Sequence, residues 1–228
     1  MKIFNITPNL SFQNPDLVEK FHNASFLTLS PMEDEKLQNN IFVKCEISSE
    51  AYVLMMIASE ICKDLENEDI GFLSGESSVG EEEIEEIVDF LKDANFIITD
   101  ENMLNFHKDK ENIKALLNLI ASNFNLKIID SAGNKLDLKS ANLGELKELD
   151  NFDGAVVYKH TKDDEFKGGN YFKIVSKVKD GELVTIKSKN LNITKTFKFD
   201  KNLKGTIAFL GVKNLDNYAF EVVKTHKA

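Results

Sequence analysis

The stretch Asn95 to Asp130, NFIITDENMLNFHKDKENIKALLNLIASNFNLKIID, decides the fold of the N-terminal part of the chain. It begins with Phe96-Ile97-Ile98, a run apolar on both faces, as is typical of an inner strand of a parallel sheet. A helical pattern and a second apolar run follow, with short joins between them. Strand, helix, strand is the pattern of a βαβ unit, so we predict a Rossmann-like layered α/β domain with a parallel sheet. The apolar face of the helix consists of Ile113, Leu116, Leu117 and Ile120.

Two further helices are predicted upstream of this stretch. Residues Leu54 to Leu65 carry apolar side chains at helical spacing and on other sides too, which predicts a helix covered on most of its circumference. Ser48 or Ser49 can serve as its N-cap. The second helix sets an apolar stripe against an acidic face, which either docks a basic partner protein or is simply solvated. The partner-docking candidates on this face are Glu81, Glu82, Glu85 and Glu86.

The rest of the N-terminal part predicts shorter elements. Apolar runs at Phe26 to Leu29 and Ile41 to Val43 indicate strands, and Pro15 suits the first turn of a helix. After the last predicted strand, the sequence becomes rich in small and turn-forming residues. We therefore predict an α/β layered domain over residues 1–135 and a connecting loop over residues 136–152.

Residues 153–228 show a spacing of two between apolar side chains, which predicts short strands. The segment from Phe172 to Val178 precedes an Asp180-Gly181 turn signal and the segment from Leu183 to Lys187 follows it, so we expect a hairpin there. Further alternating runs predict five or six strands in all. A compact barrel or sandwich is therefore expected as a second domain.

Charge divides the chain in a similar way. The net charge is −10, and all 28 basic residues are lysines. Residues 1–150 hold 29 acids and 13 lysines, net −16, whereas residues 151–228 hold 9 acids and 15 lysines, net +6. Without arginine the chain lacks the planar fork that binds phosphate or guanine through two bonds, and its acidic balance repels a nucleic-acid backbone. We therefore expect no nucleic-acid partner.

The sequence contains neither a membrane-span pattern nor a recognisable set of metal ligands. No stretch approaches the roughly 18 apolar residues of a membrane span, and the N-terminus has no secretory signal pattern, so we expect a cytoplasmic protein. Cys45 and Cys62 are too few for an iron–sulfur cluster and are predicted to be buried thiols. The histidines are far apart and are expected at the surface or as capping residues. They are His22, His107, His160 and His226.

The motifs of common active sites are incomplete in this sequence. Gly75 and Gly80 have the spacing of a P-loop, but Glu81 and Glu82 follow where phosphate binding requires Lys and Ser or Thr. No nucleophile elbow or dinucleotide-binding glycine pattern is found. The acidic run at residues 163–165 lacks the spacing of a calcium loop, so a solvated loop is predicted there. We assign no catalytic residue, no metal ligand and no cofactor.

The stretch quoted first resembles a unit of the molybdopterin oxidoreductase superfamily, which has an apolar strand, a histidine-containing turn, a helix with an Asn-Ile pair and another strand. Phe96-Ile97-Ile98, His107 and Asn112-Ile113 stand at those places. The region from Ser30 is similar to part of the G subunit of bacterial respiratory complex I, where a Glu-x-Gly-Ser-Glu-like turn opens a long apolar helix. Ser48 replaces the glycine of that turn.

The C-terminal domain is similar to the β-barrel at the end of the same family. The run FDGAVVYKHTKDDEF, from Phe152, is followed by a Val-x-Ile strand and a final bend. Gly181 and Gly205 match the two turns that characterise this barrel. The resemblance implies a small, double-psi-like C-terminal β-barrel.

Two departures from the family limit what the resemblance implies. The cysteine-rich, cluster-binding region of a G subunit is missing, and Thr99-Asp100 replace a family glycine. The resemblance implies a shortened, non-catalytic scaffold or donor-docking subunit in a variant complex I without the usual NADH-oxidising subunits. Its partners would be other peripheral-arm subunits and a small electron-carrier protein. It would be held at the inner face of the cytoplasmic membrane through that complex.

Two other functions stay open at this point. A flavin or nucleotide could bind in the α/β domain near Thr99 and Asp100, because such folds bind ligands at the carboxyl ends of their strands. That reading would make the chain a component of an oxidoreductase. Alternatively, the chain could be a free-standing adaptor that links other proteins.

Overall fold

The computed structural model describes residues 1–65, 68–139 and 141–228. The chain divides into two compact units, Met1–Leu149 and Asp150–Ala228, which we call unit 1 and unit 2 and describe separately. The division falls inside the predicted connecting loop. In the described part of the chain, every helix is too short or too polar to cross a bilayer.

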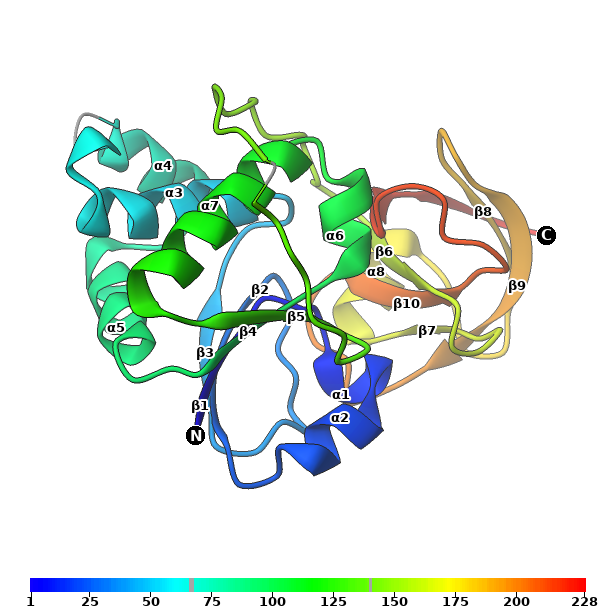
Figure 1. Cartoon of the computed structure of the whole chain (residues 1–228). Helices are drawn as coiled ribbons and strands as arrows, with labels where there is room; N and C mark the ends of the chain where they lie inside the picture. The colour runs from blue at the N-terminus through cyan, green and yellow to red at the C-terminus, as the bar shows by residue number, and fades with distance from the viewer. Residues whose placement is uncertain (66–67, 140) are drawn as a thin grey trace. The chain divides into compact units, whose positions relative to one another are not determined.

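Unit 1 is built on a five-stranded parallel sheet with the order β3-β2-β1-β4-β5 (Figure 1). The predicted α/β class and its parallel sheet are therefore confirmed. The central strand is not among the predicted ones, because four residues at a chain terminus give too short a pattern. The strands are β1 (Lys2–Asn5), β2 (Ser25–Ser30), β3 (Asn40–Lys44), β4 (Phe96–Thr99) and β5 (Lys127–Asp130).

Helices cover both faces of this sheet, because its inner strands are apolar on both sides. Phe4 and Ile97 belong to one core, and their neighbours Ile3 and Ile98 belong to the other. The first face is covered by α3 (Glu50–Ile61), α5 (Glu81–Leu91) and α7 (Lys110–Phe124), and the second by α1 (Leu10–Gln13) and α2 (Pro15–Lys20) (Figure 1). The remaining helices of unit 1 are η1 (Lys63–Leu65), α4 (Ile70–Ser77) and α6 (Glu101–Phe106).

Two of these helices match their predictions closely. The first nine residues of α3 are buried, so it is the predicted core helix. Its N-cap is Ser49, whose hydroxyl donates to the carbonyl of Glu46 and does not cap a helix amide. In α5, Ile84 and Ile87 are buried below an exposed acidic face.

The strand order reverses between β1 and β4. The chain places β2 and β3 on one side of β1, returns through α3, α4 and α5, and then places β4 and β5 on the other side. The connection after β1 covers one face of the sheet and the connection after β4 covers the other. In open α/β sheets this reversal is where ligands bind, at the carboxyl ends of the strands.

Unit 2 is a curled, mixed sheet with the order β11-β6-β10-β7-β9-β8-β12 (Figure 1). β10 lies between β6 and β7 and is parallel to β6, and β7 is parallel to β9. The rings of Phe166, Phe172 and Phe197 pack together in its core. A barrel-like second unit is thereby confirmed. Its strands are β6 (Val156–His160), β7 (Phe166–Gly168), β8 (Leu183–Lys187), β9 (Asn192–Phe199), β10 (Ile207–Gly211), β11 (Phe220–Val222) and β12 (Lys224–Lys227).

The predicted hairpin around Asp180-Gly181 is wrong in its first strand. Asn170–Ser176 form a helix, α8, in which Phe172 is fully buried and Ile174 is 61% exposed. The apolar residues two apart therefore do not share a buried face, as they would in a strand. The hairpin forms instead between β8 and β9.

Candidate functional site

Buried polar side chains gather at the carboxyl ends of the strands of unit 1. Asn5 ends β1, Thr7 follows it, and Thr99 ends β4 beside Asp100, so these residues lie where the strand order reverses. Asn5 Nδ2 donates to the Thr7 carbonyl at 3.2 Å and to Thr28 Oγ1 at 3.3 Å. This edge therefore contains Thr99 and Asp100, which the sequence predicted, and also Asn5 and Thr7, which it did not indicate.

Two buried hydroxyls at this edge are unusual for their surroundings. The side chains of Thr7 and Thr99 are fully buried, and neither hydroxyl has a hydrogen-bond partner among the described residues. Leaving a buried hydroxyl unpaired costs about 1–3 kcal/mol. Valine would fill a similar volume without that cost. The edge is therefore more polar than packing alone requires.

Asp100 has a structural role at the same edge. It is 6% exposed and caps α6 by accepting the backbone N–H of Asn102 at 3.0 Å. Burial raises the pKa of its carboxyl from 3.8 to about 6, although hydrogen bonds from Asn102 and Gln13 oppose the rise. Asp100 therefore changes its charge in mildly acidic solution.

The connection after β1 does not form a phosphate cradle. Nucleotide phosphates in such folds sit on a glycine-rich turn at a helix N-terminus. Here the turn is Thr7-Pro8-Asn9, without glycine, and α1 is only four residues long. The alternative of a flavin or nucleotide near Thr99 and Asp100 gains no support from this turn.

A second buried polar cluster lies where α3 begins. His107 Nε2 lies 2.9 Å from Ser48 Oγ and 3.6 Å from Glu50 Oε2. The other ring nitrogen, Nδ1, accepts the backbone N–H of Asp109 at 2.9 Å. Because Nδ1 is an acceptor, the ring proton lies on Nε2. The ring therefore has no lone pair to take a proton from Ser48, and the two residues are not arranged as a base and a nucleophile.

The same cluster fixes the end of unit 1. The Asp109 carboxylate accepts the N–H of Lys147 at 3.2 Å and a proton of Asn112 Nδ2 at 2.9 Å. Asn112 in turn accepts the N–H of Gly144 at 2.7 Å and donates to the carbonyl of Glu145 at 3.0 Å. Most of the predicted connecting loop is thus attached to unit 1.

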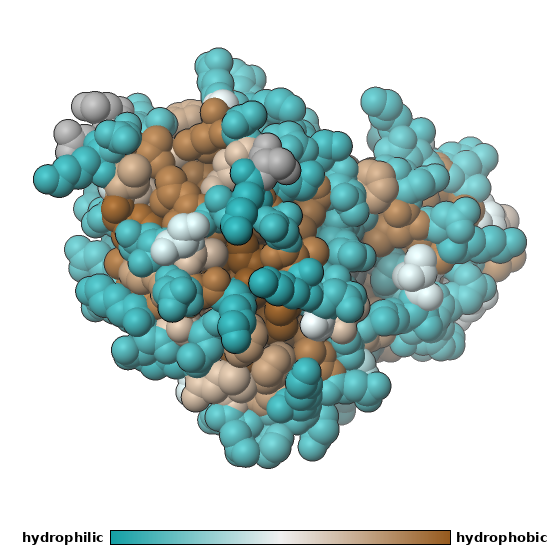
Figure 2. All heavy atoms as spheres, in the orientation of Figure 1, coloured by the Kyte–Doolittle hydropathy of each residue, from teal (hydrophilic) through white to brown (hydrophobic). Residues whose placement is uncertain are grey.

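The acidic face of α5 is exposed, as the sequence predicts. Glu83 differs from its neighbours because its Oε2 accepts the N–H of Gly80 at 3.0 Å, which caps the helix. Figure 2 shows hydrophilic side chains over the part of unit 1 where Figure 1 places α5. The predicted docking acids Glu81, Glu82, Glu85 and Glu86 are all exposed and have no part in this cap.

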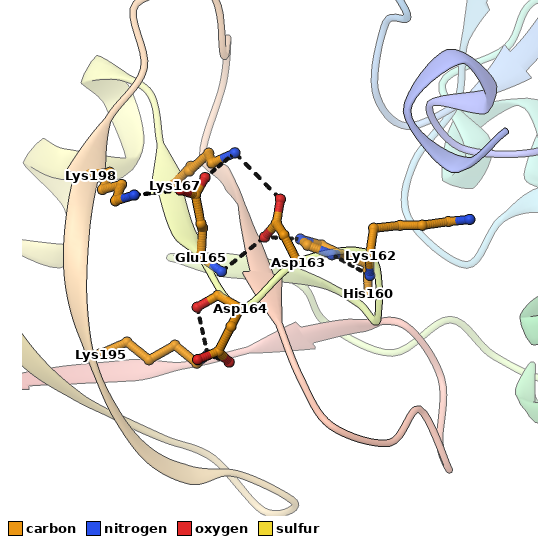
Figure 3. A network of polar contacts seen from close by, with 8 residues as sticks. All are labelled: His160, Lys162, Asp163, Asp164, Glu165, Lys167, Lys195 and Lys198. Atoms are coloured by element: carbon orange, nitrogen blue, oxygen red, sulfur yellow. Dashed lines mark hydrogen bonds and ion pairs between the residues drawn. The ribbon is translucent and has the colours of Figure 1, made fainter. Parts of the chain in front are cut away.

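In unit 2, the acidic run at residues 163–165 is engaged by lysines (Figure 3). Hydrogen bonds from Lys167 and Lys198 lower the pKa of the Glu165 carboxyl to about 2. Asp163 also accepts the backbone N–H of Glu165 at 2.8 Å. These contacts hold the turn between β6 and β7. The ion pairs join Asp163 and Glu165 to Lys167, Asp164 to Lys195, and Glu165 to Lys198.

A buried ion pair joins β6 to β11. Lys159 is 2% exposed, and its Nζ lies 2.7 Å from Oε2 of Glu221. Burial opposes ionisation of Glu221, but hydrogen bonds from Lys159 and Ser188 outweigh it, and the pKa of the carboxyl is lowered. A paired, hydrogen-bonded charge of this kind is a structural feature of the sheet.

Two of the predictions about cysteine and histidine are corrected. Cys45 is buried as predicted and burial raises the pKa of its thiol, whereas Cys62 is half-buried. His107 and His160 are both buried, so neither lies at the surface, but His107 is the C-cap of α6 and its ring accepts the N–H of Asp109, which agrees with the predicted capping role.

No protein-family model matches this chain, and no curated protein matches it.

Proposed function

We propose that this chain is a non-catalytic accessory subunit of a respiratory quinone oxidoreductase of the complex I type, where it helps to assemble the peripheral arm or to dock an electron donor. The resemblance described above motivates the proposal. The structural observation that supports it is a parallel α/β unit followed by a curled β unit, with Gly181 and Gly205 in left-handed turns at φ 74° and 71°. These turns precede β8, which carries buried Val184 and Ile186, and β10.

The proposed docking surface is the acidic face of α5. The helix is anchored by Ile84, Ile87 and Leu91, which are buried in the core, so its outer acids are carried on a fixed support. A face of one charge sign attracts a partner surface of the opposite sign and speeds its approach. The expected partner surface is therefore basic. On this proposal the protein is cytoplasmic and reaches the membrane only through the complex.

Affinity capture of the tagged full chain from membranes of its source organism tests this proposal. Capture of complex I subunits supports it, and their absence from the captured material contradicts it. A variant with four substitutions should capture less of them, while Glu83 is kept because it caps the helix. The variant combines Glu81→Gln, Glu82→Gln, Glu85→Gln and Glu86→Gln, and the control removes the same charge from exposed acids elsewhere in unit 1 through Asp16→Asn, Glu19→Gln, Glu60→Gln and Asp64→Asn.

A further inference from the structure

A cavity of about 430 Å³ lies in unit 1 between α3, α4 and the segment that ends the unit. This volume lies within the range of small-molecule sites, roughly 300–1,000 Å³. The cavity combines aromatic rings, carboxylates and a few apolar side chains. The residues that give it chemical character are Tyr52, Phe72, Glu68, Asp69 and Glu145.

The two aromatic rings form an inclined pair. Their centroids are 5.9 Å apart and their planes meet at 45°. Tyr52 is 2% exposed and Phe72 is 50% exposed, so Tyr52 belongs to the base of the cavity and Phe72 to its rim. Aromatic faces attract cations, and the half-exposed ring of Phe72, supported from behind by Tyr52, offers such a face at the rim.

The charges around the cavity are negative. Glu68, Asp69 and Glu145 line it, and its described lining contains no lysine. Burial raises the pKa of the Tyr52 hydroxyl, and the nearby carboxylates of Asp109, Glu76 and Glu148 add to the rise. This electrostatic field repels phosphates and carboxylates and favours a positively charged ligand.

The wall formed by the end of unit 1 is held in place before any ligand binds. Tyr52 Oη donates to the carbonyl of Lys147 at 3.1 Å. Asn112 holds Gly144 and Glu145 through the two hydrogen bonds described above. A preformed wall reduces the entropy that binding must overcome. The buried polar cluster around Asn112 therefore fixes one wall of this cavity.

We propose that this cavity binds a small organic cation whose head is a substituted ammonium group. The head would lie against the exposed ring of Phe72, with Glu68 and Glu145 supplying the countercharge. Binding such a cation would explain both the solvent-exposed ring of Phe72 and the excess of carboxylates in the described lining. This inference does not depend on the role in complex I, because it concerns the purified chain alone.

Calorimetric titration of the full chain with choline tests the inference. The comparison ligand is the uncharged analogue in which carbon replaces the quaternary nitrogen, which keeps shape and removes charge. We expect choline to bind and the analogue to bind at least about 5-fold more weakly. Added salt should lower the affinity for choline. Equal affinity for the two ligands, or no binding of choline up to about 10 mM, would overturn the proposal.

Two variants locate the site. Phe72→Leu keeps an apolar side chain but removes the aromatic face, and should weaken choline by about 2–5-fold without changing binding of the analogue. Glu145→Gln should also weaken the binding of choline. The matched controls are Phe106→Leu, at another exposed phenylalanine of unit 1, and Glu19→Gln, on α2. If the control variants reduce choline binding as much as the site variants do, the site lies elsewhere and the assignment is refuted.

Discussion

Asn112 Oδ1 accepts the backbone N–H of Gly144 at 2.7 Å, a bond between residues 32 positions apart that ties the end of unit 1 to α7. Removing it with Asn112→Ala should release residues 144–147, since the carbonyl of Glu145 loses its donor as well. We expect faster hydrogen exchange in this segment and faster tryptic cleavage after Lys147, with local stability lower by about 1–3 kcal/mol.

The control for this prediction is Asn123→Ala, which changes an exposed asparagine in the last turn of α7. It should leave exchange and cleavage of residues 144–147 unchanged. If Asn112→Ala also leaves both rates at the wild-type level, the segment is held by contacts other than these hydrogen bonds.

Ser48 combines a left-handed backbone, φ 68°, with a hydroxyl 2.9 Å from His107 Nε2. Ser48→Gly should be close to neutral, because relief of about 1 kcal/mol of backbone strain offsets loss of a hydrogen bond of similar worth. Ser48→Ala keeps the strain and loses the bond, so it should destabilise by about 1–2 kcal/mol. Urea unfolding measures both, and a glycine variant less stable than the alanine variant would contradict this account.

Asp100 should give the protein a stability that depends on pH. Its pKa is raised from 3.8 to about 6 on folding, so the folded state favours the protonated carboxyl. The contribution is full below about pH 4 and is lost as the pH rises through about 6. Relative to Asp100→Asn, which can still cap α6, wild type should lose on the order of 2–3 kcal/mol between these pH values.

Urea unfolding of both proteins across this range is the measurement. A constant difference between wild type and Asp100→Asn would show that the carboxyl titrates alike in the folded and unfolded chain. An opposite slope, with wild type gaining stability as the pH rises, would mean that the folded structure favours the ionised carboxylate.

The unpaired hydroxyl of Thr99 can be tested by comparison with a paired one. Thr99→Val removes a buried hydroxyl that has no partner among the residues the structure describes, so the free energy of unfolding should stay the same or rise by up to about 1 kcal/mol. Thr28→Val should lower it by about 1–3 kcal/mol, because the Thr28 hydroxyl donates to Asn40 and accepts from Asn5. Equal losses in the two variants would mean that Thr99 is also paired in solution.

The sequence was sufficient for the part of the fold that has unbroken apolar runs or a clear helical stripe. Phe96 to Thr99, apolar on both faces, correctly predicts an inner parallel strand, and the stripe through Ile84 and Ile87 correctly predicts α5. It failed where patterns are short or ambiguous. β1 has only two apolar residues, Ile3 and Phe4, between polar ones, and α8 places apolar residues two apart as a strand would.

The candidate sites were less accessible from the sequence. Thr99 and Asp100 could be proposed because strand ends are readable, but Thr7 was missed together with β1. The cavity unites Tyr52, Phe72 and Glu145, which lie on three separate segments, and no local pattern links them. Such a site depends on tertiary packing, and here on hydrogen bonds from Asn112 that fix one wall.

The most direct test of the proposed function is native gel electrophoresis of membranes extracted in mild detergent, with the protein composition of each band identified by mass spectrometry. The account predicts that this chain migrates in the same high-mass band as the peripheral-arm subunits of complex I. Migration only as the free chain, with the complex intact and lacking it, would contradict the assignment.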